Sequence, residues 1–109
     1  LPVGLNFDAK TRRPSYTMED LFQAHILGMD TWALGLLKAA QLIEDGRVDA
    51  FIQQRYASFD GELGRKIRAG QATLKELSDH ALRMKQPSLP GSGRQEYLES
   101  VLNDVLFGG

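Results

Sequence analysis

The stretch from Thr17 to Gly46, TMEDLFQAHILGMDTWALGLLKAAQLIEDG, carries the longest helical pattern in the chain. Thr17 followed three residues later by Asp20 is close to a capping box, so the spacing predicts a helix that begins at Met18. Apolar residues recur at intervals of three and four over a broad face, which indicates a helix covered on more than one side. We expect Gly46 to end this helix as a left-handed cap.

Two glycines inside this helical pattern need a reason. Gly28 and Gly35 lie two turns apart on one face, and each costs about 1 kcal/mol relative to alanine in a helix interior. Close approach of another backbone would offset that cost, so we expect a packing partner along this face.

Residues 1–9 have the alternation of a single β-strand. Val3, Leu5 and Phe7 alternate with Gly4, Asn6 and Asp8, and the polar segment 10–15 that follows is predicted to be a loop. One strand alone cannot pair its backbone groups, so either the strand prediction is wrong or its partners lie in sequence outside this chain. A start without methionine or a basic leader also indicates that the chain is cut from a longer one.

Four shorter helical patterns follow Gly46 and bring the expected total to about five helices. Thr73 and Glu76 form a full capping box, and Ser92 and Gln95 match another. Residues 86–91 are typical of a linker. The expected segments are Arg47 to Ser58, Asp60 to Gly70, Thr73 to Met84 and Ser92 to Leu106.

Composition excludes several classes of protein. A length of 109 residues fits one domain but not a complete (β/α)₈ barrel, which needs roughly 250 residues. Thirteen basic against fourteen acidic residues, a net charge of −1, offer no electrostatic reason to expect nucleic acid or an anionic membrane as partner. The absence of cysteine excludes disulfides and thiolate nucleophiles, and no apolar run is long enough to span a bilayer. Phosphate-binding and nucleophile-elbow motifs are also absent.

Asp8 is the sharpest candidate for chemistry. It is an acid at the C-terminal end of an apolar strand, where barrel and α/β enzymes place catalytic and metal-binding groups. A capped turn is the simpler alternative. Lys10, Arg12 and Arg13 can pair with a carboxylate or a phosphate, although three basic residues in a loop are more often simply solvated.

The remaining candidate residues are expected to have structural roles and not to take part in chemistry. His25, on the mainly apolar stripe of the long helix, is expected to be a core histidine because no metal-binding spacing accompanies it. His80 is expected at the surface, and Asp30 is expected to be exposed or hydrogen-bonded rather than catalytic. Three large apolar side chains are expected to pack: Phe22, Met29 and Trp32.

The segment Leu5-Asn-Phe-Asp-Ala-Lys10, followed by Thr-Arg-Arg13, resembles the last barrel strand of xylose isomerases of the longer, class II type. Pro2-Val3-Gly4 departs from the paired glycines of that pattern. Further stretches are similar to the C-terminal region of the family in order and spacing: Asp20-Leu-Phe-x-Ala-His-Ile26, Gly28-Met-Asp-Thr31, Arg55-Tyr-Ala-Ser-Phe-Asp60, Leu63-Gly64, Gln95-Glu-Tyr-Leu-Glu99 and Leu106-Phe107-Gly108.

This resemblance implies a mostly α chain with two parts. Residues 1–46 would be the last strand and helix of a (β/α)₈ TIM barrel, and residues 47–109 an extended α-helical C-terminal tail that serves as the oligomerisation arm of a homotetramer. In the family, two divalent cations, Mg²⁺, Mn²⁺ or Co²⁺, assist a hydride shift that interconverts D-xylose and D-xylulose, or glucose and fructose. Asp8 stands at the position of a metal ligand.

The resemblance further implies a cytoplasmic parent enzyme of xylose metabolism that acts on an aldose. The other metal ligands and the acid–base residues have no counterpart here, so we expect the 109 residues to be inactive alone. The alternative is an independent small helical domain that binds a protein partner through the apolar face of residues 18–43.

Overall fold

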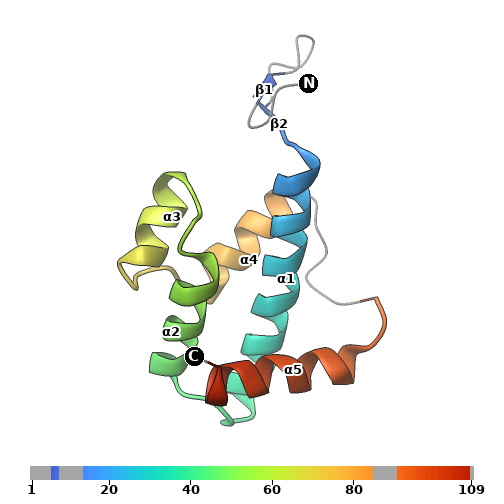
Figure 1. Ribbon diagram of the computed structural model, residues 1–109, viewed down its shortest axis with the longest axis vertical. Helices are drawn as coiled ribbons and strands as arrows, with labels where there is room; N and C mark the ends of the chain where they lie inside the picture. The colour runs from blue at the N-terminus through green and yellow to red at the C-terminus, as the bar shows by residue number, and fades with distance from the viewer. Residues whose placement is uncertain (1–5, 8–13, 85–90, 109) are drawn as a thin grey trace.

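The computed structural model describes residues 6–7, 14–84 and 91–108. Within these ranges it contains five helices and one pair of two-residue strands, so the mostly helical class is confirmed for the described part of the chain (Figure 1). The elements are β1 (Asn6–Phe7), β2 (Pro14–Ser15), α1 (Met18–Ala39), α2 (Asp45–Tyr56), α3 (Gly61–Arg68), α4 (Leu74–Arg83) and α5 (Arg94–Phe107).

The strand prediction is correct only at its centre. β1 pairs antiparallel with β2, with Asn6 opposite Ser15 and Phe7 opposite Pro14. The expectation of a loop over residues 10–15 is therefore wrong at Pro14 and Ser15, and β1 has one partner inside the chain. A return of the backbone within about ten residues satisfies some of its hydrogen-bonding groups locally, which the alternating pattern by itself did not indicate.

The start of α1 is confirmed and its end is not. The Thr17 Oγ1 atom accepts from the Asp20 N–H at 3.1 Å, and the Asp20 carboxylate accepts from the Thr17 N–H at 3.2 Å. The helix ends at Ala39, because Gln41 takes a left-handed conformation with φ of 60°. The N–H of Leu42 then bonds the carbonyl of residue 37, and that of Gln41 the carbonyl of residue 38, which is a Schellman motif. The predicted cap, Gly46, lies instead in the first turn of α2.

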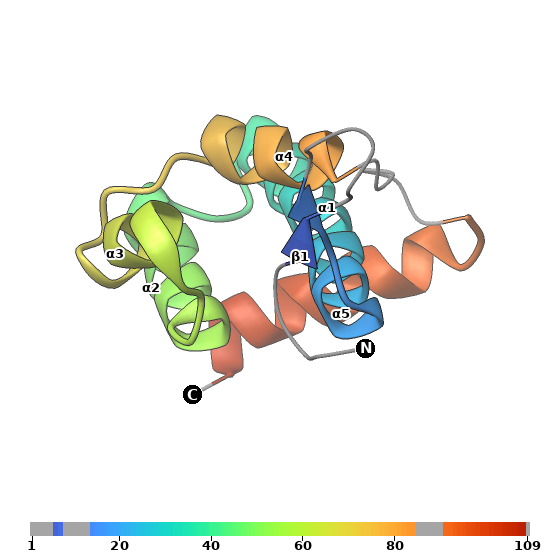
Figure 2. The same ribbon diagram turned by 90° about the horizontal axis from the view of Figure 1, so that it is seen from above.

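The core forms where α1 packs against α4 and α5, and α2 packs against α3 and α5 (Figure 2). Helices from both halves of the chain contribute fully buried side chains: Leu27, Leu34, Ile67, Leu77 and Val101. The broad apolar face of α1 is thus covered on more than one side, as expected. Much of the face proposed for an outside partner is already used within the chain.

The two glycines of α1 differ from each other. Gly28 is buried, whereas Gly35 is exposed and a Cβ atom added there would meet no atom within 4 Å. The expectation of a close backbone partner at Gly35 is therefore wrong within the described part of the chain.

The two predicted capping boxes of the later helices have opposite outcomes. At α4, the Thr73 hydroxyl accepts from the Glu76 N–H and the Glu76 carboxylate accepts from the Thr73 N–H, both at 3.1 Å. At α5, the N-cap is Gly93 with φ of 65°, and no side chain caps the helix. A glycine in the left-handed region shifts the helix start by one residue, so Ser92 cannot serve as the N-cap.

The prediction that Phe22, Met29 and Trp32 pack in the interior is correct in part. Trp32 packs partly buried against the core, and Met29 is half-buried. Phe22, expected to pack, is 66% exposed. No helix in the described residues is both long and apolar enough to cross a bilayer.

Candidate functional site

Asp8, the predicted metal ligand, lies outside the described residues, and so do Lys10, Arg12 and Arg13. In the sequence Asp8 falls between β1 and β2, directly after Phe7. Among residues 6–7, 14–84 and 91–108, no three histidine, aspartate or glutamate side chains are grouped so as to hold a metal ion.

A buried carboxylate cluster joins three helices in the described part of the chain. Asp30, in the middle of α1, has no exposed surface. The hydroxyl of Tyr56, at the end of α2, donates to its Oδ2 atom, and the hydroxyl of Tyr97, in the first turns of α5, donates to its Oδ1 atom. Arg55 Nη1 lies 3.4 Å from Oδ2. A buried charge requires such partners, because an unpaired carboxylate would lose its hydration without replacement.

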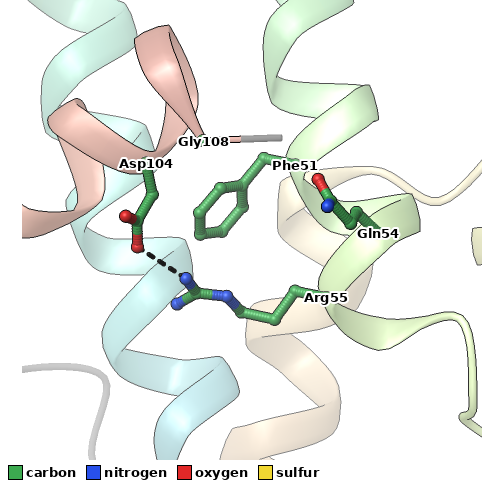
Figure 3. A pocket seen from close by; sticks show the side chains of 5 residues that line it. All are labelled: Phe51, Gln54, Arg55, Asp104 and Gly108. Atoms are coloured by element: carbon green, nitrogen blue, oxygen red, sulfur yellow. Dashed lines mark hydrogen bonds and ion pairs between the residues drawn. The ribbon is translucent and has the colours of Figure 1, made fainter.

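Arg55 extends this cluster to the molecular surface. Its Nη2 atom donates to the Asp104 carboxylate of α5 at 2.7 Å, and its guanidinium lies 4.4 Å from the centre of the Phe51 ring. Figure 3 shows these side chains around a surface hollow of about 240 Å³, which Gln54 and Gly108 also line. One guanidinium therefore serves two carboxylates from two different helices.

The electrostatics keep both tyrosines protonated. Burial, then the charge and the hydrogen bond of Asp30, raise the pKa of the Tyr56 hydroxyl well above its ordinary value of 10. Burial and the same carboxylate also raise the pKa of Tyr97. Burial opposes the charge of Arg55, but Asp30 and Asp104 outweigh it and raise the pKa of that guanidinium. The donors therefore hold their protons at neutral pH, so each can donate a hydrogen bond to its carboxylate and link two helices.

Asp30 was expected to be exposed or hydrogen-bonded, and the second alternative is confirmed. Its partners were missed, because they follow it by 25 to 67 residues and no spacing rule connects such positions. The available signal was an acid within the apolar pattern of a long helix, since a buried acid implies donors elsewhere in the fold.

The two histidines lie in different surroundings. His25 is half-buried in α1. His80 is also half-buried, with its ring 5.8 Å from that of Phe59, so the expectation that it lies at the surface is correct only in part. Burial, with a smaller contribution from the nearby charge of Arg83, lowers the pKa of His80. The polar residues just before His80, Ser78 and Asp79, gave no indication of its contact with Phe59 in the loop between α2 and α3.

Residues 52–106, about half of the chain, match the family described as the XylA2 C-terminal domain. The chain belongs to this family. It is 52% identical over 102 residues to a xylose isomerase of Novosphingobium aromaticivorans, a match that covers 94% of this chain and 23% of the relative. The resemblance drawn from the sequence motifs is thereby confirmed.

Other curated relatives agree with this assignment. A xylose isomerase of Thermotoga petrophila is 48% identical over 103 residues, covering 94% of this chain and 23% of the relative. One of Thermoanaerobacterium saccharolyticum is 51% identical over 104 residues, covering 95% and 24%. The chain thus spans about a quarter of the length of the relatives that it matches, and it corresponds to their C-terminal part. No solved structure matches the chain.

Proposed function

We propose that this chain forms the C-terminal part of a metal-dependent aldose–ketose isomerase that interconverts D-xylose and D-xylulose, and also glucose and fructose. The observation that carries the proposal is identity of about 50% across 94% of the chain to curated xylose isomerases. Such identity, together with the motif around Asp8, supports a shared reaction more strongly than a shared fold would.

Within this proposal, residues 1–46 are the final βα unit of a TIM barrel, and residues 47–109 are a helical arm that joins subunits of a cytoplasmic homotetramer. β1 precedes α1 along the chain, with the two-residue strand β2 between them. The four later helices bury side chains against α1 and against one another. The arm would therefore be anchored to the barrel helix by the same core that the chain builds for itself.

Asp8 would hold one of two divalent cations, Mg²⁺, Mn²⁺ or Co²⁺. A carboxylate is the ligand that a hard cation prefers, so the residue type fits, although its geometry lies outside the described residues. When bound, the cation supplies a Lewis acid for the sugar oxygens. One carboxylate does not complete the coordination of such an ion, so we propose that the 109 residues alone are inactive.

The test is Asp8→Asn in the full-length enzyme of which this chain is the C-terminal part. We expect xylose isomerisation at saturating Mg²⁺ to fall at least about 100-fold, which corresponds to about 2.7 kcal/mol. Asp49→Asn, an exposed acid on α2, is the matched control and should leave activity unchanged. Full activity of the Asp8→Asn enzyme would exclude the metal-ligand role.

A further inference from the structure

The sequence contains two Asp-Gly pairs, and the structure places them in different backbone environments. Asp45 and Gly46 begin α2, and the Asp45 carboxylate lies 2.8 Å from Lys38 Nζ. Asp60 and Gly61 lie at the exposed corner between α2 and α3 (Figure 1). Asp60 is extended, with φ of −90° and ψ of 171°, and Gly61 has φ of 72°. The second pair therefore lies outside regular helical geometry, although α3 is counted from Gly61.

An Asp-Gly pair can convert itself to isoaspartate without any other reagent than water. The glycine nitrogen attacks the aspartate Cγ atom, so that an N–Cγ bond forms, a Cγ–O bond breaks, and the hydroxyl leaves with the amide proton as water. A second water molecule reopens the resulting succinimide ring. Cleavage of the N–Cγ bond restores aspartate, whereas cleavage of the original peptide C–N bond leaves isoaspartate, with an unchanged total mass and no oxidation or reduction.

The ring closes only after the backbone rotates about ψ of the aspartate and brings the next nitrogen to Cγ. At Asp45 that rotation would disrupt the first helical hydrogen bonds of α2 and displace the carboxylate from Lys38. At Asp60 the side chain makes no capping hydrogen bond to α3, and the carbonyl accepts from the Gly64 N–H at a long 3.3 Å. Rotation therefore costs less at Asp60.

The surroundings of Asp60 also leave room for both steps. A Cβ atom added at Gly61 would meet no atom within 4 Å, so the space beside the attacking nitrogen is open. Asp60 and Gly61 both line a hollow of about 330 Å³, which admits several of the water molecules that reopen the ring.

We propose that Asp60 is a site of spontaneous isoaspartate formation in the folded protein, and that the helix and the ion pair protect Asp45 from the same reaction. The site goes beyond the proposed function and does not depend on it, because both Asp-Gly pairs lie among the described residues.

The modification alters a packed corner of the fold. The ring of Phe59 lies 5.5 Å from that of Tyr56 and 5.8 Å from that of His80. Its carbonyl accepts from Arg68 Nη1 at 2.7 Å. Isoaspartate at position 60 inserts one methylene group into the main chain directly after Phe59. The contacts of Phe59 and the start of α3 then cannot both keep their present positions.

Trypsin isolates the two pairs in peptides that serve as matched controls for each other. Residues 56–65 contain Asp60-Gly61, residues 39–47 contain Asp45-Gly46, and both peptides end in arginine. The full-length protein that contains this chain is held at neutral pH and physiological temperature for several weeks and then digested. Electron-transfer fragmentation distinguishes isoaspartate from aspartate, because the extra main-chain methylene changes the fragments. The same two peptides, synthesised and incubated free, give the rate of each pair without the fold.

Relative to the free peptides, we expect isoaspartate to form in residues 56–65 of the folded protein at least about tenfold faster than in residues 39–47, the factor that a barrier difference of about 1.4 kcal/mol gives. Asp60→Glu, which keeps the charge but must close a larger ring, should remove the signal from residues 56–65. Equal relative rates at the two pairs would overturn the proposal, and so would unmodified Asp60 in folded protein after the free peptide has isomerised. Persistence of the signal in Asp60→Glu would place the modification elsewhere and also refute it.

Discussion

Tyr97→Phe tests whether the buried carboxylate cluster holds α5 to the rest of the chain. The Tyr97 hydroxyl is the donor to Asp30 Oδ1 among the described residues, while Oδ2 receives both Tyr56 and Arg55. Removal of the hydroxyl leaves a fully buried carboxylate oxygen without its partner, and a hydrogen bond to a charged group contributes about 1.5–3 kcal/mol. The free energy of unfolding should fall by about that amount.

The assay is urea unfolding of the chain followed by circular dichroism, with the slope m compared between variants to confirm that only stability changed. Tyr56→Phe should cost less, because Arg55 remains within reach of Oδ2 at 3.4 Å. Tyr16→Phe, at an exposed position, is the control and should stay within about 0.5 kcal/mol of the unsubstituted chain. A Tyr97→Phe chain as stable as this control would refute the role assigned to the cluster.

Three further predictions follow from local features. Thr73→Ala should lower the free energy of unfolding by about 1 kcal/mol through loss of its capping bonds, whereas Ser92→Ala should change it little, because Ser92 caps no helix; equal losses in urea unfolding would contradict this. Gly64→Ala should destabilise, because its Cβ would overlap the carbonyl of the preceding loop, while Gly35→Ala should stabilise by about 1 kcal/mol in open space; thermal melts with the reverse order would disprove both assignments. The lowered pKa of His80 means that the unfolded chain binds a proton at this residue more readily than the folded chain does. The contribution of neutral His80 to stability is therefore present above about pH 6.5 and is lost as pH falls below that value. His80→Gln should flatten that part of the profile of urea midpoint against pH, and an unchanged profile would contradict this role of His80.

Local sequence rules predicted the positions of the helices correctly but only some of the residues at which they begin and end. Thr17 and Thr73 cap helices as predicted, because a side chain and a backbone group three residues apart interact within one turn. Gln41 and Gly93 explain the errors. A left-handed residue was expected at Gly46, yet Gln41 adopts that conformation, since the Schellman hydrogen bonds and the burial of Ile43, two residues further on, compensate its cost.

Of the two candidate sites, the one built from neighbouring residues could be predicted from the sequence and the one built from distant residues could not. The motif around Asp8 was recognisable from adjacent residues, and the comparisons confirm the family that it indicates. The Asp30 cluster was not recognisable, because Tyr56 and Tyr97 approach it only after α2 and α5 have packed on α1.

The sequence by itself determined the helical class, the order of the helices, the start of α1 and the resemblance to the C-terminal part of xylose isomerases. These depend on periodicity, capping and motifs, which act between residues a few positions apart. Only the tertiary structure decided which acid is buried, that His80 packs against an aromatic ring, and that Phe22 remains exposed. Burial depends on which faces of distant helices meet, and that arrangement balances the packing of the whole chain rather than the preference of any single segment.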